Sequence, residues 1–320
     1  HPDDRFYRKK LSSIYAAQKQ WEKALSIYRE IIERNPEDLE SKIAYGEVLF
    51  SKGDLDSAEV YFLKLLDDNS DDWRIIYFLG RINMSGEDYQ AAEGYFRKLI
   101  DVKPQIPEGY TNLGLTLFQQ GREGEAVELL DSALVKFPDD YGVNFIMGSA
   151  LNSLKRYSEA RKYFLKALEI VPNDIRARGS LAMVYDNLGE YEESDRIYEE
   201  ILTENPDHHL TLNNYSYSLA ERGIQLERAL EMAKRAVKQR PDNPAYLDTL
   251  GWIYFKLGFY TRALEYIERS VKIDASSPEV LEHLGDIHSK LGDKEMARKY
   301  YEKALELEKD NKRLIEKIEY

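Results

Sequence analysis

Histidine is the residue type in this sequence with the most scope for chemistry, because its side chain can hold a metal ion or transfer a proton near neutral pH. The five histidines are His1, His208, His209, His283 and His288. His283 and His288 are five residues apart, so they do not share one face of a helix. His208 and His209 are adjacent in a segment that reads as a turn. Because a third ligand at helical spacing is missing, the sequence predicts no metal site.

An acidic run, residues 67–72 with the sequence DDNSDD, is a second candidate for a ligand site. A calcium-binding loop of the EF-hand type also needs a central glycine and a terminal glutamate, and this run has neither. Asp, Asn and Ser are favoured at helix ends, where their side chains bond to the backbone. We therefore interpret the run as a solvated turn that caps two helices.

Signatures of catalysis are likewise missing from the sequence. It contains no GxSxG motif, no glycine-rich phosphate loop and no HExxH motif. It also contains no cysteine, which excludes disulfides, thiol catalysis and thiolate metal sites. These observations predict a protein that is not an enzyme and uses no cofactor.

The composition limits the classes of partner. The formal net charge is −13 and no cluster of Lys and Arg stands out, so neither nucleic acid nor an anionic membrane surface is an expected partner, since both attract a basic patch. Direct insertion of this segment into a membrane is not expected either. No apolar run approaches the roughly 20 residues of a transmembrane helix, and no signal peptide is visible. The chain begins with His1 rather than Met, so we expect a mature or truncated fragment.

The element available to position side chains is a pair of helices, which residues 244–277 show most clearly. One face of the first helix is formed by Leu247, Leu250, Gly251 and Tyr254. Gly258 follows and suits the left-handed conformation that ends a helix. The second helix has a stripe formed by Ala263, Ile267 and Ser270. Small residues at facing positions allow the two backbones to approach closely, and each pair needs a neighbour to bury its outer face.

The same pattern recurs every 34 residues, with one step of 35 whose additional residue falls in the turn at 222–226. The nine copies begin at Arg5, Leu39, Trp73, Pro107, Tyr141, Ile175, His209, Pro244 and Pro278. A helix–turn–helix period of this length, with small residues at fixed positions, resembles the tetratricopeptide repeat. The resemblance covers residues 5–311, which is nearly the whole chain.

This resemblance implies an all-α fold, an α-solenoid in which nine repeats form a right-handed superhelix. Residues 1–4 are then an N-terminal remnant, residues 5–311 the repeat array and residues 312–320 a capping helix. The cap is expected because the last repeat of a solenoid must cover its exposed face.

The resemblance also implies a binding face. In this family the first helices line the concave side, through the second, fifth, sixth, ninth, twelfth and thirteenth positions of each unit. The inward residues selected in this way are Tyr77, Arg81, Asn112, Leu115, Phe118, Phe145, Asn152, Arg176, Met183, Asn187, Asn213, Asn214, Tyr217, Asp248, Trp252 and Phe255. Aromatic and amide side chains together suit an extended peptide. The alternative is that several pack between helices. This alternative is stronger for Phe78, at another inward position, and for Phe145 than for Trp252 and Tyr217.

Charge at the inner positions differs between the two ends of the chain. The basic inner residues of the first six units are Lys9, Lys10, Arg74, Arg81 and Arg176. Acidic residues follow in the last two units, at Asp248, Glu279, Glu282 and Asp286. A partner with its own charge asymmetry would be held in one direction. An ordinary solvated surface is the alternative interpretation.

A narrower resemblance covers Leu212 to Val271. The lengthened turn after AERG (220–223) and the run LDTLGW (247–252) are similar to the C-terminal part of bacterial envelope repeat proteins. These include outer-membrane lipoproteins that act as scaffolds for periplasmic processing proteases. The resemblance implies a periplasmic or outer-membrane-anchored protein, and the absence of cysteine fits an oxidising compartment. A cytoplasmic location is the alternative.

The sequence thus predicts a non-catalytic scaffold or adaptor that binds a protein or an extended peptide in a concave groove. The finer prediction is a role in a bacterial envelope assembly or a protease-adaptor complex. An alternative is a regulatory repeat module of a larger enzyme, or of a secretion or assembly machine whose catalytic part lies outside this chain. A homo-oligomer formed by end-to-end stacking is a further alternative.

Overall fold

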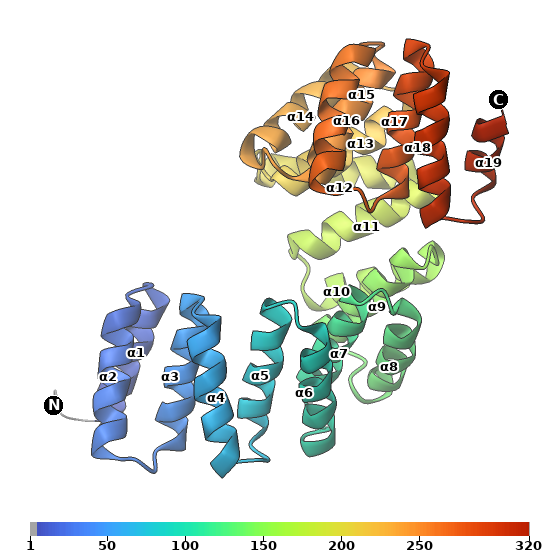
Figure 1. Cartoon of the computed structure of the whole chain (residues 1–320). Helices are drawn as coiled ribbons and strands as arrows, with labels where there is room; N and C mark the ends of the chain where they lie inside the picture. The colour runs from blue at the N-terminus through green and yellow to red at the C-terminus, as the bar shows by residue number, and fades with distance from the viewer. Residues whose placement is uncertain (1–4, 320) are drawn as a thin grey trace. The chain divides into compact units, whose positions relative to one another are not determined.

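A computed structural model describes residues 5–319, and all regular structure in that range is α-helical (Figure 1). Nine helix pairs are followed by a single helix, which confirms the predicted all-α architecture of nine repeats and a C-terminal cap. The predicted remnant at residues 1–4, with His1, and the last residue, Tyr320, lie outside the described range. No helix within it is both long and apolar enough to cross a lipid bilayer.

The first helices of the pairs are α1 (Arg5–Ala17), α3 (Leu39–Lys52), α5 (Trp73–Ser85), α7 (Pro107–Gln119), α9 (Tyr141–Ser153), α11 (Ile175–Leu188), α13 (His209–Arg222), α15 (Pro244–Lys256) and α17 (Pro278–Leu291). The second helices are α2 (Trp21–Arg34), α4 (Leu55–Asp68), α6 (Tyr89–Val102), α8 (Glu123–Lys136), α10 (Tyr157–Ile170), α12 (Tyr191–Glu204), α14 (Leu226–Gln239), α16 (Tyr260–Ile273) and α18 (Lys294–Leu307). The final helix is α19 (Lys312–Glu319).

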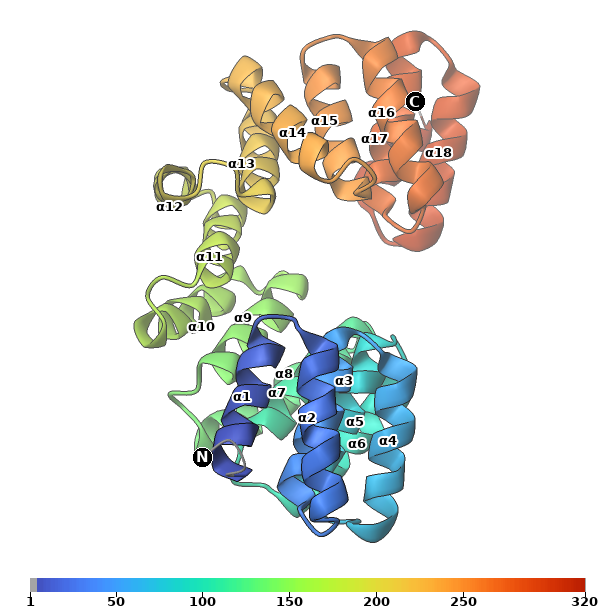
Figure 2. The same ribbon diagram turned by 90° about the vertical axis from the view of Figure 1, so that its left-hand side faces the viewer.

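The chain divides into two compact units, the N-terminal unit up to Asp174 and the C-terminal unit from Ile175. Within each unit the two helices of a pair pack together, and the second helix of a pair packs on the first helix of the next (Figure 2). First helices of successive pairs also touch, as α5 touches α7 in the N-terminal unit and α13 touches α15 in the C-terminal unit. Each unit therefore has one side built from first helices alone.

The small residue of the first helix makes room for a large side chain of the second helix. A Cβ atom added at Gly80 would lie 2.5 Å from a ring carbon of Phe96, and one added at Gly251 would lie 2.5 Å from Cγ1 of Ile267. Both of these larger residues are fully buried. The close approach expected from the sequence is therefore a contact between a glycine and a bulky side chain of the second helix.

The turns explain the regular period and its one exception. Gly258 has a φ of +83°, the left-handed conformation that the sequence predicted at the end of α15. In the longer turn, Gly223 and Gln225 both have positive φ, at +67° and +47°. The additional residue is thus absorbed in the turn before α14, and the pairing of α13 with α14 is kept.

The acidic run at 67–72 caps helices, as predicted. The Nδ2 atom of Asn69 donates to the carbonyl oxygen of Leu65 at 3.0 Å, at the end of α4. The Oδ1 atom of Asp72 accepts from the backbone N–H of Arg74 at 2.9 Å, at the start of α5. Arg74 also donates from its guanidinium to Asp72, and this hydrogen bond lowers the pKa of the Asp72 carboxyl.

The C-terminal helix α19 covers α17 and α18, and it changes the predicted charge pattern. Leu314 is fully buried. Arg313 and Lys317 donate to Glu282 at 2.6 and 2.7 Å, and Lys317 also pairs with Asp286 at 2.5 Å. Glu282 and Asp286, expected from the sequence to face a partner, are therefore neutralised within the chain. A side chain from α19 reaches them because the cap packs where the first helix of a tenth repeat would stand.

Candidate functional site

A groove along α11, α13 and α15 of the C-terminal unit has a volume of about 840 Å³. We call it the C-terminal groove. It is lined by Met183, Asp186, Asn187, Tyr191, Tyr198, Asn213, Asn214, Tyr217, Ser218, Glu221, Arg222, Pro244, Ala245, Asp248, Thr249, Ser270, Asp274, Ser277, Glu279 and Val280. Because first helices touch one another along this side, the groove crosses successive repeats.

Six residues selected from the sequence line this groove: Met183, Asn187, Asn213, Asn214, Tyr217 and Asp248. Two of their amides meet at Met183, and a third amide bonds to one of these two. Asn187 donates to the backbone oxygen of Met183 at 2.9 Å, and Asn214 donates to its sulfur at 3.2 Å. Asn213 in turn donates to Oδ1 of Asn214 at 3.3 Å. Amide groups that both donate and accept are thus held in order along the groove.

Asn213 has an unusual position in this row. The residue is 7% exposed, and its Oδ1 atom has no hydrogen-bond partner within residues 5–319. A buried polar atom without a partner costs free energy, about 1–3 kcal/mol. A ligand N–H group that reached this oxygen would therefore recover part of that cost.

The floor of the groove is organised by Asp186. Its carboxylate accepts hydrogen bonds from Ser194 at 2.6 Å, Ser218 at 2.8 Å and Tyr198 at 3.2 Å. Burial raises the pKa of Asp186 above its ordinary value, and these hydrogen bonds oppose part of that rise. The three donors come from α12 and α13, so Asp186 ties α11 to both of its neighbours.

Trp252 is buried, in contrast to the expectation that it reaches a partner. It is 7% exposed and its ring stacks on His283 at 3.9 Å and on Phe255 at 4.7 Å between centroids. Its Nε1–H donates to Glu221 at 2.6 Å. The neighbouring repeat supplies a flat ring at the position above Trp252, and this stacking removes the indole from the groove surface.

Asp248 is also buried and pairs with His283, with 3.0 Å between Oδ1 and Nδ1. Burial alone would lower the pKa of His283, but the charge of Asp248 and its hydrogen bond outweigh burial and raise that pKa. His283 thus acts as a structural partner of Asp248.

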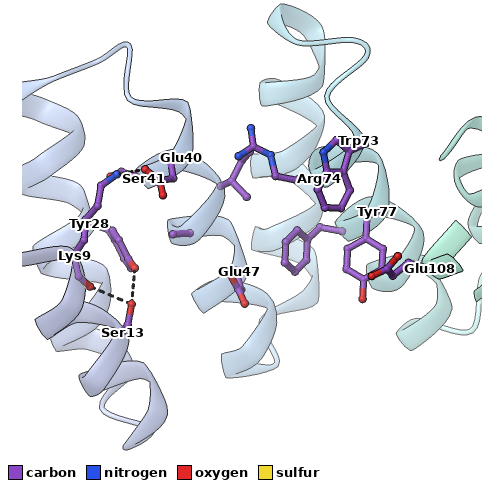
Figure 3. Close-up of a pocket in the computed structure, with 13 residues that line it drawn as sticks. Lys9, Ser13, Tyr28, Glu40, Ser41, Glu47, Trp73, Arg74, Tyr77 and Glu108 are labelled. Carbon is purple, nitrogen blue, oxygen red and sulfur yellow. Dashed lines mark hydrogen bonds and ion pairs between the residues drawn. The ribbon is translucent and has the colours of Figure 1, made fainter. Parts of the chain in front are cut away.

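The N-terminal unit has a smaller groove of about 490 Å³, which we call the N-terminal groove (Figure 3). It is lined by Lys9, Ser13, Tyr28, Glu40, Ser41, Ile43, Ala44, Glu47, Trp73, Arg74, Tyr77, Phe78 and Glu108. Tyr77 is the one predicted site residue in its lining. The two basic residues of the N-terminal groove already have acidic partners, since Lys9 pairs with Glu40 and Arg74 pairs with Asp72, each at 2.6 Å. The predicted basic surface is therefore largely matched within the chain at this groove.

The other predicted site residues lie outside both linings: Arg81, Asn112, Leu115, Phe118, Phe145, Asn152, Arg176, Trp252 and Phe255. Arg81 lies over the rings of Phe50 and Tyr77, at 4.9 and 5.5 Å. Phe145 meets the ring of Phe164 at 5.8 Å. Several of these side chains therefore pack between neighbouring helices, the alternative that the sequence left open.

The lining also contains residues that the sequence analysis did not select, among them five from α11, α13 and α15: Asp186, Glu221, Ala245, Thr249 and Ser218. Four of them stand at the second, sixth, twelfth or thirteenth position of their repeats, so the same positional rule would have found them. Ser218 stands at the tenth position and enters the lining through its hydrogen bond to Asp186. No positional signal points to Ser218, because its role depends on a carboxylate of the preceding repeat.

Comparison with known proteins connects this architecture to a family. Three family models, each described as tetratricopeptide repeat, match residues 15–82, 77–141, 111–175, 151–212, 224–278 and 278–311. TPR repeat-containing protein PA4667 of Pseudomonas aeruginosa is 28% identical over 144 residues, which are 44% of this chain and 24% of that protein. The chain thus spans about a quarter of that relative.

Solved structures share the fold at low sequence identity. A tetratricopeptide repeat protein from Parabacteroides merdae matches with a TM-score of 0.62 and 19% identity, over 77% of this chain and 97% of that one. The hetero-tetramer Cut9–Hcn1 of the APC/C matches with a TM-score of 0.55 and 14% identity, over 93% of this chain and 52% of that one. At these identities the likeness concerns the arrangement of helices.

Proposed function

Because this chain belongs to the tetratricopeptide repeat family, whose repeats form protein–protein interaction scaffolds, we propose that its C-terminal groove binds an extended polypeptide segment of a partner protein. The observation that carries the proposal is the row of ordered amides that crosses α11 and α13 in the groove. An extended backbone presents N–H and C=O groups at regular intervals, and Asn side chains match both.

The side chains of the groove differ in how exposed they are, and this supports the proposal that it binds a peptide. Asn187 and Met183 are exposed at the rim, and Asn214 and Tyr217 are half-buried. Buried Thr249 and Ser218 form part of the floor. A ligand would therefore meet hydrogen-bonding groups at several depths, together with the flat surface of Tyr217. This mixture of anchors suits recognition of a peptide.

Random dodecapeptides displayed on phage and panned against the full chain would test the proposal. Synthetic copies of enriched peptides are then titrated by fluorescence anisotropy. Asn214→Ala combined with Asn187→Ala removes two amides, each able to make hydrogen bonds of about 0.5–1.5 kcal/mol, so binding should weaken about tenfold.

Asn205→Ala is the matched control, because this exposed asparagine lies in the turn before α13, outside the groove lining. It should leave the dissociation constant unchanged. Equal binding by the wild type and the double variant would refute the groove assignment. Unfolding curves of all three proteins establish that the substitutions act on binding.

A role as an adaptor in a bacterial envelope complex is the finer form of this proposal. Its support is the resemblance of residues 212–271 to envelope repeat proteins and the absence of cysteine. Fractionation of the source organism, followed by detection of this protein with an antibody, tests it. A purely cytoplasmic signal would contradict the envelope role while leaving peptide binding in place.

A regulatory module of a larger enzyme or assembly machine is the second candidate. It is favoured by the match to PA4667, which covers only 24% of that protein. The length of the natural gene product is the discriminating measurement. A natural product with a separate catalytic domain would support this candidate, and one made of repeats alone would exclude it.

A further inference from the structure

The lining of the C-terminal groove is rich in carboxylates. Its acidic members are Asp186, Glu221, Asp248, Asp274 and Glu279, and its one basic member is Arg222. The Arg222 guanidinium donates to Asp195, at 2.6 and 3.1 Å, so its charge is already matched by a residue outside the lining. The groove therefore has a surplus of negative charge.

Three of these carboxylates gather near one hydroxyl group, that of Tyr217. The hydroxyl donates a hydrogen bond to Glu279. Burial, followed by the negative charges of Glu279, Glu221 and Asp248, raises the pKa of Tyr217 far above its ordinary value. Tyr217 thus stays neutral at physiological pH and does not add a further negative charge.

The three carboxylates differ in how far the chain itself compensates them. Asp248 is paired with His283 at 3.0 Å. Glu221 accepts from Trp252, and its carboxylate lies 3.5 Å from Nζ of Lys256. Glu279 is exposed and accepts from the neutral Tyr217 hydroxyl. Its charge acts on His283 and Arg313, but these two cations are bonded to Asp248 and Glu282 instead. The least compensated charge therefore stands at the groove rim, where a ligand can reach it.

A second feature of the same groove points to a ligand. Oδ1 of Asn213 is buried and has no hydrogen-bond partner in the described part of the chain. The backbone N–H of a bound segment is a suitable donor for it. No group of three or more His, Asp or Glu side chains among residues 5–319 could hold a metal ion. The cation that complements Glu279 is therefore expected to be organic.

We propose that the C-terminal groove selects a polypeptide segment with an arginine or lysine, whose cationic head binds at the carboxylates of Glu279 and Glu221 beside Tyr217. This inference rests on the proposed function, because the peptide backbone must lie along Asn187 and Asn214. A guanidinium can donate to carboxylates through several N–H groups and lie against an aromatic face. The half-buried Tyr217 provides that face, since its hydroxyl is bonded to Glu279 and Glu221 follows it by one turn of α13.

The test uses the same phage-displayed dodecapeptide library and the full chain. We expect enriched peptides to share a basic residue at a constant distance from an apolar one. Each basic peptide is then compared with a copy in which citrulline, a neutral analogue of similar shape, replaces arginine. The citrulline copy should bind at least about fivefold more weakly, and raising the salt concentration should narrow that difference.

The variants Glu279→Gln and Glu221→Gln test whether these two carboxylates cause the preference for arginine over citrulline. Glutamine keeps an oxygen that can accept from Tyr217 or Trp252, so the fold is preserved while the charge is removed. Each variant should bind the arginine peptide more weakly than the wild type does and should bind the citrulline copy with unchanged affinity. Glu192→Gln on α12 is the control, because this exposed carboxylate lies outside the groove lining.

The outcomes separate the two proposals. The proposed selection for a basic residue would be overturned if the enriched peptides had no basic residue, or if the arginine and citrulline peptides bound with equal affinity. Peptide binding in the groove would still stand in that case, provided that the Asn187→Ala, Asn214→Ala variant binds the peptides more weakly than the wild type. Peptides that bind this variant as tightly as the wild type would overturn the proposed function, and the charge selection with it.

Discussion

Replacement of Gly251 by alanine tests whether close contact between paired helices sets the packing of the repeat. The new Cβ would lie 2.5 Å from Cγ1 of Ile267 and 3.1 Å from the carbonyl oxygen of Ala263. Carbon atoms in contact are normally about 3.5–4.0 Å apart. Ile267 is fully buried and the Ala263 oxygen belongs to the backbone of α16, so neither can move aside without disturbing the pair.

The expected magnitude follows from two opposing terms. Overpacking of this kind costs about 1–3 kcal/mol, and alanine gains about 1 kcal/mol over glycine inside a helix. Gly251→Ala should therefore lower the free energy of unfolding of the C-terminal unit by about 0–2 kcal/mol. Gly179→Ala on α11 is the matched control, because no atom outside its own helix lies within 4 Å of the added Cβ. That variant should gain about 1 kcal/mol.

Repeat arrays need not unfold in one step, so the assay should report on the helices concerned. Amide hydrogen exchange meets this need when it is measured in α15 and α16 for Gly251→Ala and in α11 for Gly179→Ala. The changes in stability of the two variants, each measured in its own helices, should differ by about 1–3 kcal/mol. Equal stabilisation by both substitutions would show that α15 and α16 have room for the methyl group, and the packing argument would then be wrong.

Three further predictions concern burial and charge. Leu79→Ala should lower the free energy of unfolding in urea by about 2–5 kcal/mol, because Leu79 is fully buried. Leu11→Ala, at the same position of the first repeat, should lower it by less than about 1 kcal/mol, because Leu11 is 41% exposed. Similar losses of stability in the two variants would contradict the burial pattern. Trp252→Ala should cost about 3–5 kcal/mol, so any loss of peptide binding should accompany a lower stability in urea unfolding. Lost binding with unchanged stability would show that Trp252 contacts the peptide in the groove. Because His283 has a raised folded-state pKa, its pairing with Asp248 should stabilise the unit fully below the unfolded value of about 6.5 and lose that effect as pH rises through the folded value. Unfolding midpoints between about pH 5.5 and 9 should show the advantage of wild type over Asp248→Asn shrinking with pH, and a growing advantage would reverse this assignment.

Local features of the fold could be predicted from the sequence because they depend on residues close together in the chain. A left-handed glycine such as Gly258 ends its helix through its own backbone conformation. The small residues Gly251 and Ala263 predicted a close approach of the two helices of a repeat, and the structure shows that Gly251 makes room there for Ile267. Asn187 and Asn214 were selected by the positional rule that the resemblance to the tetratricopeptide repeat implies, and both lie on the side built from first helices.

The sequence by itself therefore determined the helices and their pairing, and its resemblance to a family indicated the side on which the groove lies. Only the tertiary structure decided which inward residues remain available to a ligand. His283 of the next repeat stacks on Trp252 and pairs with Asp248, so both side chains are engaged within the chain. Arg313 of the C-terminal helix neutralises Glu282 in the same way. The physical reason is that burial and charge compensation depend on side chains some 30 residues away, which the three-dimensional packing of the repeats places opposite one another.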